Sequence, residues 1–211
     1  MAPGPTRRPL STERVVEAAL RLIDREGVGA LSMRRLGALL RVEAMSLYKH
    51  VPDKSALVEA VVARVLAELA PPDPAESWDA RLRHVANEFR RVAVAHPHVF
   101  PLLATQLPKI AVGFAPIEAM PGAFRSAGLG DAQVLAHFWS FLAYLTGALL
   151  TETAALTGEA EASFTVPESL DPASFPELRR LAAALASCDF ATEFARGLEL
   201  AITAARSAAS R

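Results

Sequence analysis

Apolar residues recur every three or four positions along most of the chain, and no stretch alternates apolar and polar residues as a half-buried strand does. The first helical stretch follows Ser11 and Thr12, either of which can cap a helix, and it ends at Gly27. Similar stretches continue to the C-terminus. The pattern therefore predicts an all-α fold of about nine or ten helices.

Two short helices joined by a tight turn are predicted within residues 31–54. Ser32 can cap the first helix, Arg41 and Val42 form the turn, and the second helix runs from residue 43 or 44 to residue 50. The positions expected to be buried are Met33, Leu36, Leu39 and Leu40 in the first helix and Ala44, Leu47 and Val51 in and after the second.

The outer face of the second short helix carries side chains suited to a nucleic-acid partner. Met45, Tyr48 and Lys49 point outward there, which suits base edges and phosphates better than water. Arg34 and Lys54 lie at helix starts, where a cation opposes the helix dipole. Because a nearby phosphate would offset that cost, the pattern indicates a helix that enters a DNA groove.

The next helix, 55–70, is apolar on nearly every side, so it is expected to pack on both parts of the chain and to link them. The prolines in 71–74 mark a domain boundary. The expected organisation is a flexible arm at 1–10, a helix-turn-helix domain at 11–70 and a helical domain at 75–211. Arg7 and Arg8 in the arm suit a phosphate contact and a solvated tail equally well.

The second domain begins with a long helix whose apolar stripe includes Trp78 and Phe89. Prolines interrupt the segments 98–108 and 110–128, which should move more easily than regular helices. The helices expected after them are 132–156, 175–187 and 189–209, with a poorly ordered loop at 157–176.

The charge is unevenly distributed along the chain. The net charge of −1 argues by itself against a nucleic-acid partner, but residues 1–60 carry ten Lys or Arg and seven Asp or Glu. The remainder of the chain is therefore acidic. A basic head on an acidic body suits a negatively charged partner that is bound at one end.

Cys188 is the single cysteine, so no internal disulfide can form and a reducing cytoplasm is the expected location. The first residues include two arginines without an apolar run behind them, which does not match a signal peptide. The most apolar stretch, 134–150, contains polar positions such as His137 and Ser140. It is therefore interpreted as a buried helix, and no membrane partner is expected.

Residues 11–70 resemble the DNA-binding domain of the tetracycline-repressor (TetR) family of bacterial transcription regulators. The resemblance rests on EGVGALSMRRLGALLRVEAMSLYKHVPDKSALVEAV, which carries the family's LS-x-R-x-L, V-x-x-x-x-LY-x-H-V and D/N-K-x-x-L segments in order. The matching residues are Leu31, Ser32, Arg34, Leu36, Val42, Leu47, Tyr48, His50, Lys54 and Leu57. Arg41 departs from the glycine usual in the family, and a non-glycine residue with positive φ costs about 1 kcal/mol. The turn is nevertheless expected to survive.

The resemblance implies a homodimer whose recognition helices lie about 34–36 Å apart, in successive major grooves of a palindromic operator in double-stranded DNA. The residues it assigns to DNA are Ser32, Met33, Arg34, Ala44, Met45, Ser46, Tyr48, Lys49, His50 and Lys54. Arg34, Met45 and Ser46 are expected at base edges and the others mainly at phosphates. The dimer is expected through helices 132–156 and 189–209, although core packing also explains their apolar residues.

The resemblance also implies a small-molecule effector that binds in the body, shifts the helix at 55–70 and lowers DNA affinity. The candidate lining residues, each of which also suits a core, are His84, Phe89, Phe100, Gln106, Phe114, His137, Trp139 and Tyr144. Val85 stands where the drug-binding asparagine of the tetracycline site is expected, and the magnesium-binding histidine has no secure counterpart. A largely apolar or aromatic effector is therefore expected, without tetracycline or magnesium.

A helical enzyme and a protein-binding adaptor are the alternative hypotheses. No glycine-rich phosphate loop or nucleophile elbow supports an enzyme, and no nearby acidic residue or cysteine completes a metal site at His96 and His98. Glu152, Glu159 and Glu161 are interpreted as solvated charges. No metal or cofactor is expected, and the expected function is a ligand-responsive transcription regulator, most simply a repressor, with activation left open.

Overall fold

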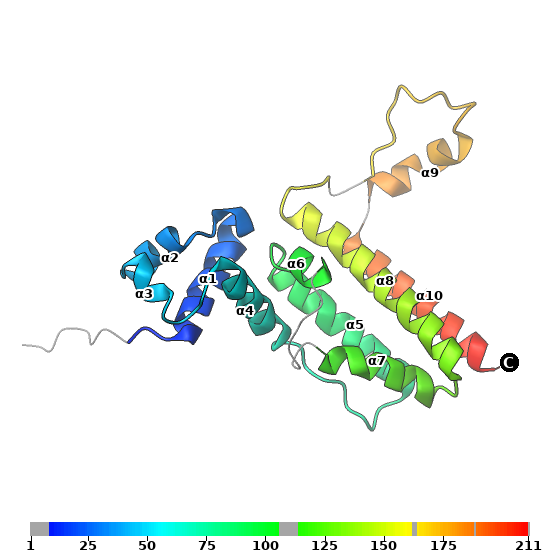
Figure 1. Ribbon diagram of the computed structural model, residues 1–211. Helices are drawn as coiled ribbons and strands as arrows, with labels where there is room; N and C mark the ends of the chain where they lie inside the picture. The colour runs from blue at the N-terminus through cyan, green and yellow to red at the C-terminus, as the bar shows by residue number, and fades with distance from the viewer. Residues whose placement is uncertain (1–8, 106–113, 162–163, 188, 211) are drawn as a thin grey trace, which may run out of the picture.

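The computed structural model describes residues 9–105, 114–161, 164–187 and 189–210. This part of the chain forms ten α-helices and one short 3-10 helix, and it contains no strand. The predicted all-α class and helix number are confirmed. Figure 1 shows a small head of N-terminal helices, coloured blue to cyan, beside a larger body made of the remaining helices.

The head contains four α-helices and the 3-10 helix η1. Their bounds are Thr12–Glu26 for α1, Val28–Ala30 for η1, Met33–Leu40 for α2, Ala44–Leu47 for α3 and Lys54–Leu66 for α4. Ser11, Ser32 and Asp53 cap α1, α2 and α4, each accepting a hydrogen bond from the backbone N–H three residues later. Gly27 ends α1 with a φ of 78° that few other residues adopt.

Two local expectations for the head are wrong. The α3 helix ends at Leu47 and the chain continues as a turn, so the recognition helix is shorter than predicted. Leu39 is 48% exposed, although it was assigned to the buried stripe of α2. The reason is that α2 packs on α3 through Leu36 and Gly37, which turns Leu39 toward solvent.

The body contains the helices α5 to α10. Their bounds are Trp78–Ala95 for α5, Phe100–Thr105 for α6, Ala115–Ser126 for α7, Asp131–Leu156 for α8, Pro176–Ala186 for α9 and Phe190–Ala209 for α10. The last three match their predicted bounds to within one residue. Pro121 lies inside α7 without ending it, so this segment is more regular than its prolines suggested.

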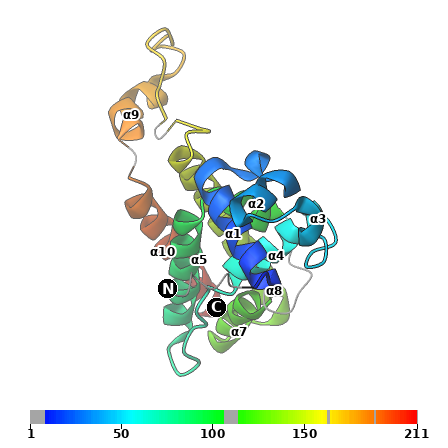
Figure 2. The ribbon, with the colours of Figure 1, turned by 90° about the vertical axis from the view of Figure 1, so that its left-hand side faces the viewer.

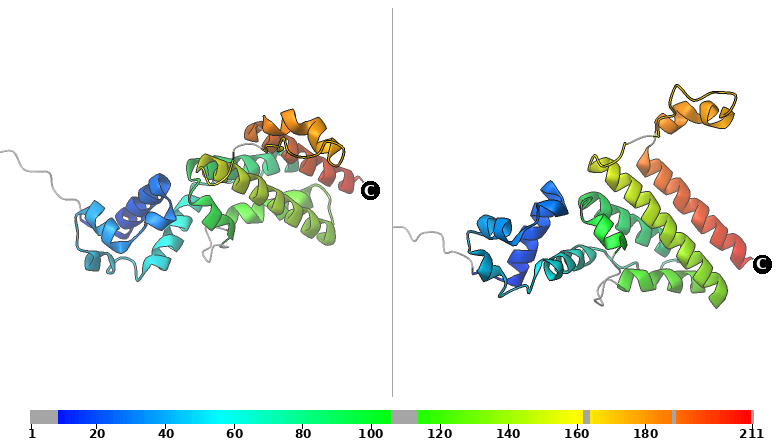
Figure 3. Two further views of the ribbon diagram at one scale, coloured as in Figure 1. Left: turned by 90° about the horizontal axis from the view of Figure 1, so that it is seen from above. Right: turned by 45° about the horizontal axis from the view of Figure 1, so that its top comes forward.

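The long helices α8 and α10 lie side by side in opposite directions, as Figures 1 and 3 show. The side chain of Gln133, near the start of α8, donates to the carbonyl of Ala208, near the end of α10, at 3.4 Å. In the same views α9 and the connection before it project away from this pair, and α9 has no buried residue. The 157–176 segment is thus a long connection, as expected.

The head and the body each have an apolar core, and the two cores meet. Val92 of α5 and Val99, just before α6, are buried in the head core together with α1 and α4. Leu69, which follows α4, packs against both cores. In Figure 2, where the head faces the viewer, α5 stands beside α1. The predicted role of the helix at 55–70 as the link between the two parts is confirmed by these contacts.

Replacing Arg41 by glycine is expected to raise the free energy of unfolding by about 0.5–1 kcal/mol, because glycine adopts this φ without a Cβ clash. Arg41 has a φ of 57°. Urea unfolding followed by circular dichroism measures the change. A loss of stability would show that contacts of the Arg41 side chain outweigh its backbone strain.

Gly37→Ala is the matched comparison, because Gly37 lies in α2 against the same turn, where a side chain does not fit. Its added Cβ would lie 2.8 Å from the carbonyl oxygen of Val42. The free energy of unfolding should therefore fall by more than about 1 kcal/mol.

Candidate DNA-binding interface

The turn between α2 and α3 is held by a close backbone approach. A Cβ on Gly37 would lie 2.8 Å from the Val42 carbonyl oxygen and 3.3 Å from the Ala44 nitrogen, so only glycine fits. The N–H of Val42 donates to the carbonyl of Gly37 at 2.9 Å. Arg41 ends α2 in the left-handed conformation, with φ 57° and ψ 46°. The turn therefore keeps the left-handed geometry that glycine usually supplies, although an arginine stands there.

Burial of one side of α3 presents its other side to solvent. Leu47 and Val51 are buried in the head core. On the opposite side Met45 is 74% exposed and Tyr48 is 42% exposed. Lys49 is also exposed, while Ser46 and His50 are half-buried beside it. The outward orientation predicted for Met45, Tyr48 and Lys49 is confirmed.

Three exposed cations surround this surface. Arg34 lies in the first turn of α2, Lys49 follows α3, and Lys54 is the first residue of α4. Within the described ranges none of the three has an acidic partner, whereas the neighbouring Arg35 forms an ion pair with Glu26. Arg34 lies at the positive end of α2, whose cap Ser32 is uncharged, and this favours an anion from outside the chain. At the start of α4 the carboxylate of Asp53 caps the helix next to Lys54.

Three other residues assigned to DNA have different surroundings. Met33 is 8% exposed and packs in the head core, as expected from its place in the buried stripe of α2, and its assignment to DNA stays a prediction. It lies on the inner side of α2 with Leu36. Ser32 is exposed, but its hydroxyl oxygen accepts the N–H of Arg35 at 3.2 Å. Ala44 is half-buried and packs against the head core.

The residues proposed to line an effector site do not gather in one place. Phe89 and Phe100 are buried together in the body core. His137 lies against Phe124, with ring centroids 5.7 Å apart. His84 instead lies at the junction with the head, where its Nε2 is 3.0 Å from the carbonyl oxygen of Ala70.

The remaining effector candidates lie at the surface or against another helix. Trp139 is 58% exposed, because it is two residues from the buried Phe141 and so on the opposite side of α8. The hydroxyl of Tyr144 donates to the carbonyl of Phe194 in α10. Phe114 is 49% exposed. Gln106 lies outside the described residues.

A groove between α7 and α8 was not anticipated from the sequence. Its volume is about 280 Å³, and Ile117, Pro121, Val134, Leu135 and Phe138 contribute its apolar lining. None of the eight effector candidates lines it. The lining residues recur at helical spacing, but the sequence does not tell which neighbouring helix completes the groove.

The interpretation of Glu152 as a solvated charge is wrong. The residue is 6% exposed, and Arg90 of α5 donates to both of its carboxylate oxygens, at 2.6 and 3.0 Å. It is therefore a buried ion-pair partner rather than a solvated charge. Its spacing from Leu145 and Leu149 places it on the buried stripe of α8, and this pattern could have revealed it.

The two histidines considered for metal binding serve the head–body junction. His96 lies between the carboxylates of Asp24 and Glu68, and His98 lies beside Gly27. Among the described residues no group of three or more His, Cys, Asp or Glu is arranged to hold a metal ion.

Both halves of the chain match models of known protein families. Residues 15–61 match the family of bacterial regulatory proteins of the tetR type, and residues 70–204 match the tetracycline-repressor-like C-terminal domain. The two matches meet close to the predicted domain boundary.

Relatives with similar sequences are regulators of transcription. An HTH-type transcriptional regulator of Saccharopolyspora erythraea is 33% identical over 149 residues, which are 70% of this chain and 63% of the relative. The HTH-type transcriptional repressor DrrR1 of Streptomyces coeruleorubidus is 33% identical over 153 residues, 69% of this chain and 54% of the relative. The chain thus spans little more than half the length of these relatives.

Solved structures agree over nearly the whole chain. The TetR family protein ActR of Streptomyces coelicolor, in complex with actinorhodin, has a TM-score of 0.80 and 29% sequence identity, and the match covers 97% of this chain and all of ActR. The helix-turn-helix head, the helical body and both family matches lead to one conclusion: this chain belongs to the TetR family of bacterial regulatory proteins.

Proposed function

We propose that the protein is a ligand-responsive, DNA-binding transcription regulator, most simply a repressor that binds a palindromic operator as a homodimer. The observation that carries the proposal is the surface of Arg34, Met45, Tyr48, Lys49 and Lys54, which places exposed cations around an exposed helix face. The regulators among its relatives support it, and none of those named is an enzyme.

The role proposed for each of these residues at DNA follows from its position on or beside the recognition helix. Met45 and Ser46 lie on the short recognition helix, where an apolar side chain can meet a thymine methyl and a hydroxyl can meet a base edge. Lys49 and Lys54 flank that helix as point charges for phosphates. Arg34, Tyr48 and His50 lie next to them, and the first two are exposed.

A second copy of the chain is the proposed partner of α8 and α10. The apolar side chains of Leu135 and Trp139 on α8 are both 58% exposed, and Leu200 on α10 is 72% exposed. Ala143 and Gly147 are exposed on α8 as well, and small residues allow helices to approach closely. A two-fold axis beside this pair would bury the same surface on both copies.

The length and composition of α8 would also suit a membrane span, and only 22% of its most apolar stretch is buried. Membership in a family of bacterial regulatory proteins favours a protein partner for this exposed face instead. A cytoplasmic location is proposed on the same basis, since the relatives are DNA-binding regulators.

The proposed effector is a largely apolar or aromatic small molecule that binds in the body. Support comes from the aromatic residues in the body core, Phe89, Phe100, Phe124 and Phe141, and from ActR, whose structure was solved with actinorhodin. An effector that prefers one arrangement of α5 and α7 would change the position of α4 through Leu69, and DNA affinity would change by the same coupling.

Lys54→Ala is expected to weaken binding to all duplex sequences alike and to lower the salt dependence of log K by about 1 per subunit, because one phosphate contact is lost. Fluorescence anisotropy with a random-sequence duplex at several salt concentrations measures this. Arg35→Ala is the control, since Arg35 pairs with Glu26 and should leave the salt slope unchanged. If wild-type protein failed to bind even at low salt, the proposed function would be wrong.

Replacing Met45 and Ser46 by alanine is expected to change which sequence is preferred while leaving binding to random DNA nearly unchanged. A lost base contact costs about 1–3 kcal/mol at the positions it reads and nothing elsewhere. Selection from a random duplex pool, followed by sequencing, compares the variant with wild type. Identical preferred sequences would show that α3 does not read bases.

Leu200→Glu is expected to convert the dimer to a monomer, because the new carboxylate of each copy would be buried in an apolar contact. Sedimentation equilibrium measures the mass of the particle. Leu39→Glu is the matched control, since Leu39 is exposed in the head. A Leu200→Glu variant with the wild-type mass would place the dimer contact elsewhere.

A further inference from the structure

A row of polar contacts, here called the seam, fastens the backbone after α4 to the side of α5. Arg91 donates to the carbonyl oxygen of Glu68 at 2.6 Å, and the N–H of Ala70 donates to the carboxylate of Glu88 at 2.9 Å. His84 lies 3.0 Å from the carbonyl oxygen of Ala70. The hydrogen bond from Arg91 holds the pKa of Glu88 at about 2. The end of α4 is therefore fixed to the body by backbone-directed bonds.

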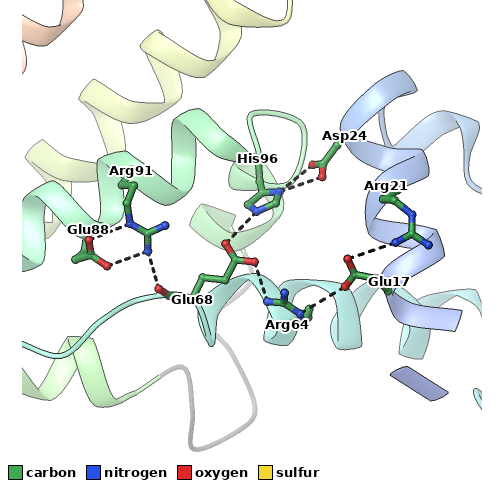
Figure 4. Close-up of polar contacts among 8 residues, drawn as sticks. All are labelled: Glu17, Arg21, Asp24, Arg64, Glu68, Glu88, Arg91 and His96. Atoms are coloured by element: carbon green, nitrogen blue, oxygen red, sulfur yellow. Dashed lines mark hydrogen bonds and ion pairs between the residues drawn. The ribbon is translucent and has the colours of Figure 1, made fainter. Parts of the chain in front are cut away.

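His96 extends the seam from the body to the head, as Figure 4 shows. It follows α5, and its side chain is only 13% exposed. Its Nδ1 lies 3.0 Å from a carboxylate oxygen of Asp24 in α1, and its Nε2 lies 3.2 Å from a carboxylate oxygen of Glu68 after α4. One imidazole thus bridges two helices of the head and the end of a body helix.

The two carboxylates define which form of the ring fits. Both ring nitrogens donate only when the imidazole is protonated, whereas the neutral ring has one N–H and one lone pair. In the neutral form the lone pair would face an oxygen of Asp24 or Glu68, and that hydrogen bond would be lost. The position between two carboxylates is therefore complete only for the imidazolium.

Other charged groups around His96 favour the same arrangement. Arg64 of α4 contacts the carboxylate of Glu68 at 2.7 Å and lies 3.6 Å from Glu17 of α1, which also pairs with Arg21 at 3.5 Å. Burial opposes ionisation of Glu68, but hydrogen bonds from His96 and Arg64 outweigh it, so the pKa of Glu68 lies below its ordinary value. His98, two residues on, lies beside Gly27 at the end of α1.

We propose that His96 is a positioning residue, which clamps the head to the body through contacts of both ring nitrogens with Asp24 and Glu68 and so fixes the head's orientation. Without the clamp Val92 and Val99 remain in the head core, so the head stays attached and gains freedom only in its angle. The inference rests on the proposed function, because that angle determines whether two recognition helices reach two half-sites together.

The effect on DNA binding follows from the geometry. Without the imidazole the bridge between Asp24 and Glu68 is lost. Binding that needs both heads at a fixed spacing should then weaken, because the effective concentration of the second head falls. Binding through one head should be independent of the clamp.

The DNA experiment compares two duplexes: the palindrome recovered by selection with the wild-type protein, and the same duplex with one half-site scrambled. For His96→Gln, we expect affinity for the palindrome to fall by about 5-fold or more, with half-site affinity unchanged.

His98→Gln is the matched control, since it changes a histidine in the same loop that does not lie between two carboxylates. It should keep the wild-type affinity for the palindrome. Asp24→Ala, which removes the acceptor for Nδ1, should behave like His96→Gln, and it serves if His96→Gln does not fold. Equal palindrome affinity in wild type, His96→Gln and Asp24→Ala would overturn the proposal.

A second measurement needs no DNA. The backbone N–H groups of residues 67–70 are hydrogen-bonded at the end of α4 and in the seam. Hydrogen exchange followed by mass spectrometry, with all proteins at one pH near 6, should show faster exchange there in His96→Gln than in wild type or His98→Gln. Unchanged exchange would contradict the clamp, whereas faster exchange in a protein that binds no DNA would reject only the proposed function.

Discussion

The structure depends on the insertion of body residues into the core of the head. Val92 and Val99 are buried with α1 and α4, and Leu69 packs against both cores. Burial of apolar side chains of this size stabilises by roughly 1.5–3 kcal/mol each, so the head is not an independent module on a flexible tether. The polar seam along α5 then gives this apolar contact a defined angle, because its hydrogen bonds are directional where the apolar packing is not.

The contact between head and body also determines how the DNA-facing surface is oriented. The short α3 helix is anchored in the head core by the buried side chains of Leu47 and Val51, and its start packs closely against Gly37 of α2. A four-residue helix has little stability of its own, so the orientation of Met45 and Tyr48 is a property of the whole head. Since the head is fixed to the body through α4 and α5, any rearrangement of the body reaches the recognition surface through few residues.

The features of the DNA-binding interface that depend on residues close in sequence could be predicted. Ser32, Asp53 and the cations at helix starts act within one helical turn, and their roles follow from local rules of capping and dipole. The sequence failed where orientation is set from a distance. Leu39 is exposed because Gly37 faces α3. The partners of His96 lie 72 and 28 positions away in the chain, so no local pattern could indicate them.

The sequence by itself determined the helices, their caps, the order of head and body and the family, because periodicity, capping and motif spacing all act over short separations. Only the tertiary structure decided which face of each amphipathic helix is covered. It showed that the exposed apolar face of α8 is the one that carries Trp139, that Glu152 is a buried ion-pair partner, and that one imidazole bridges Asp24 and Glu68. The physical reason is that helical spacing fixes angles within one helix, whereas the rotation of one helix against another is set by packing among all of them.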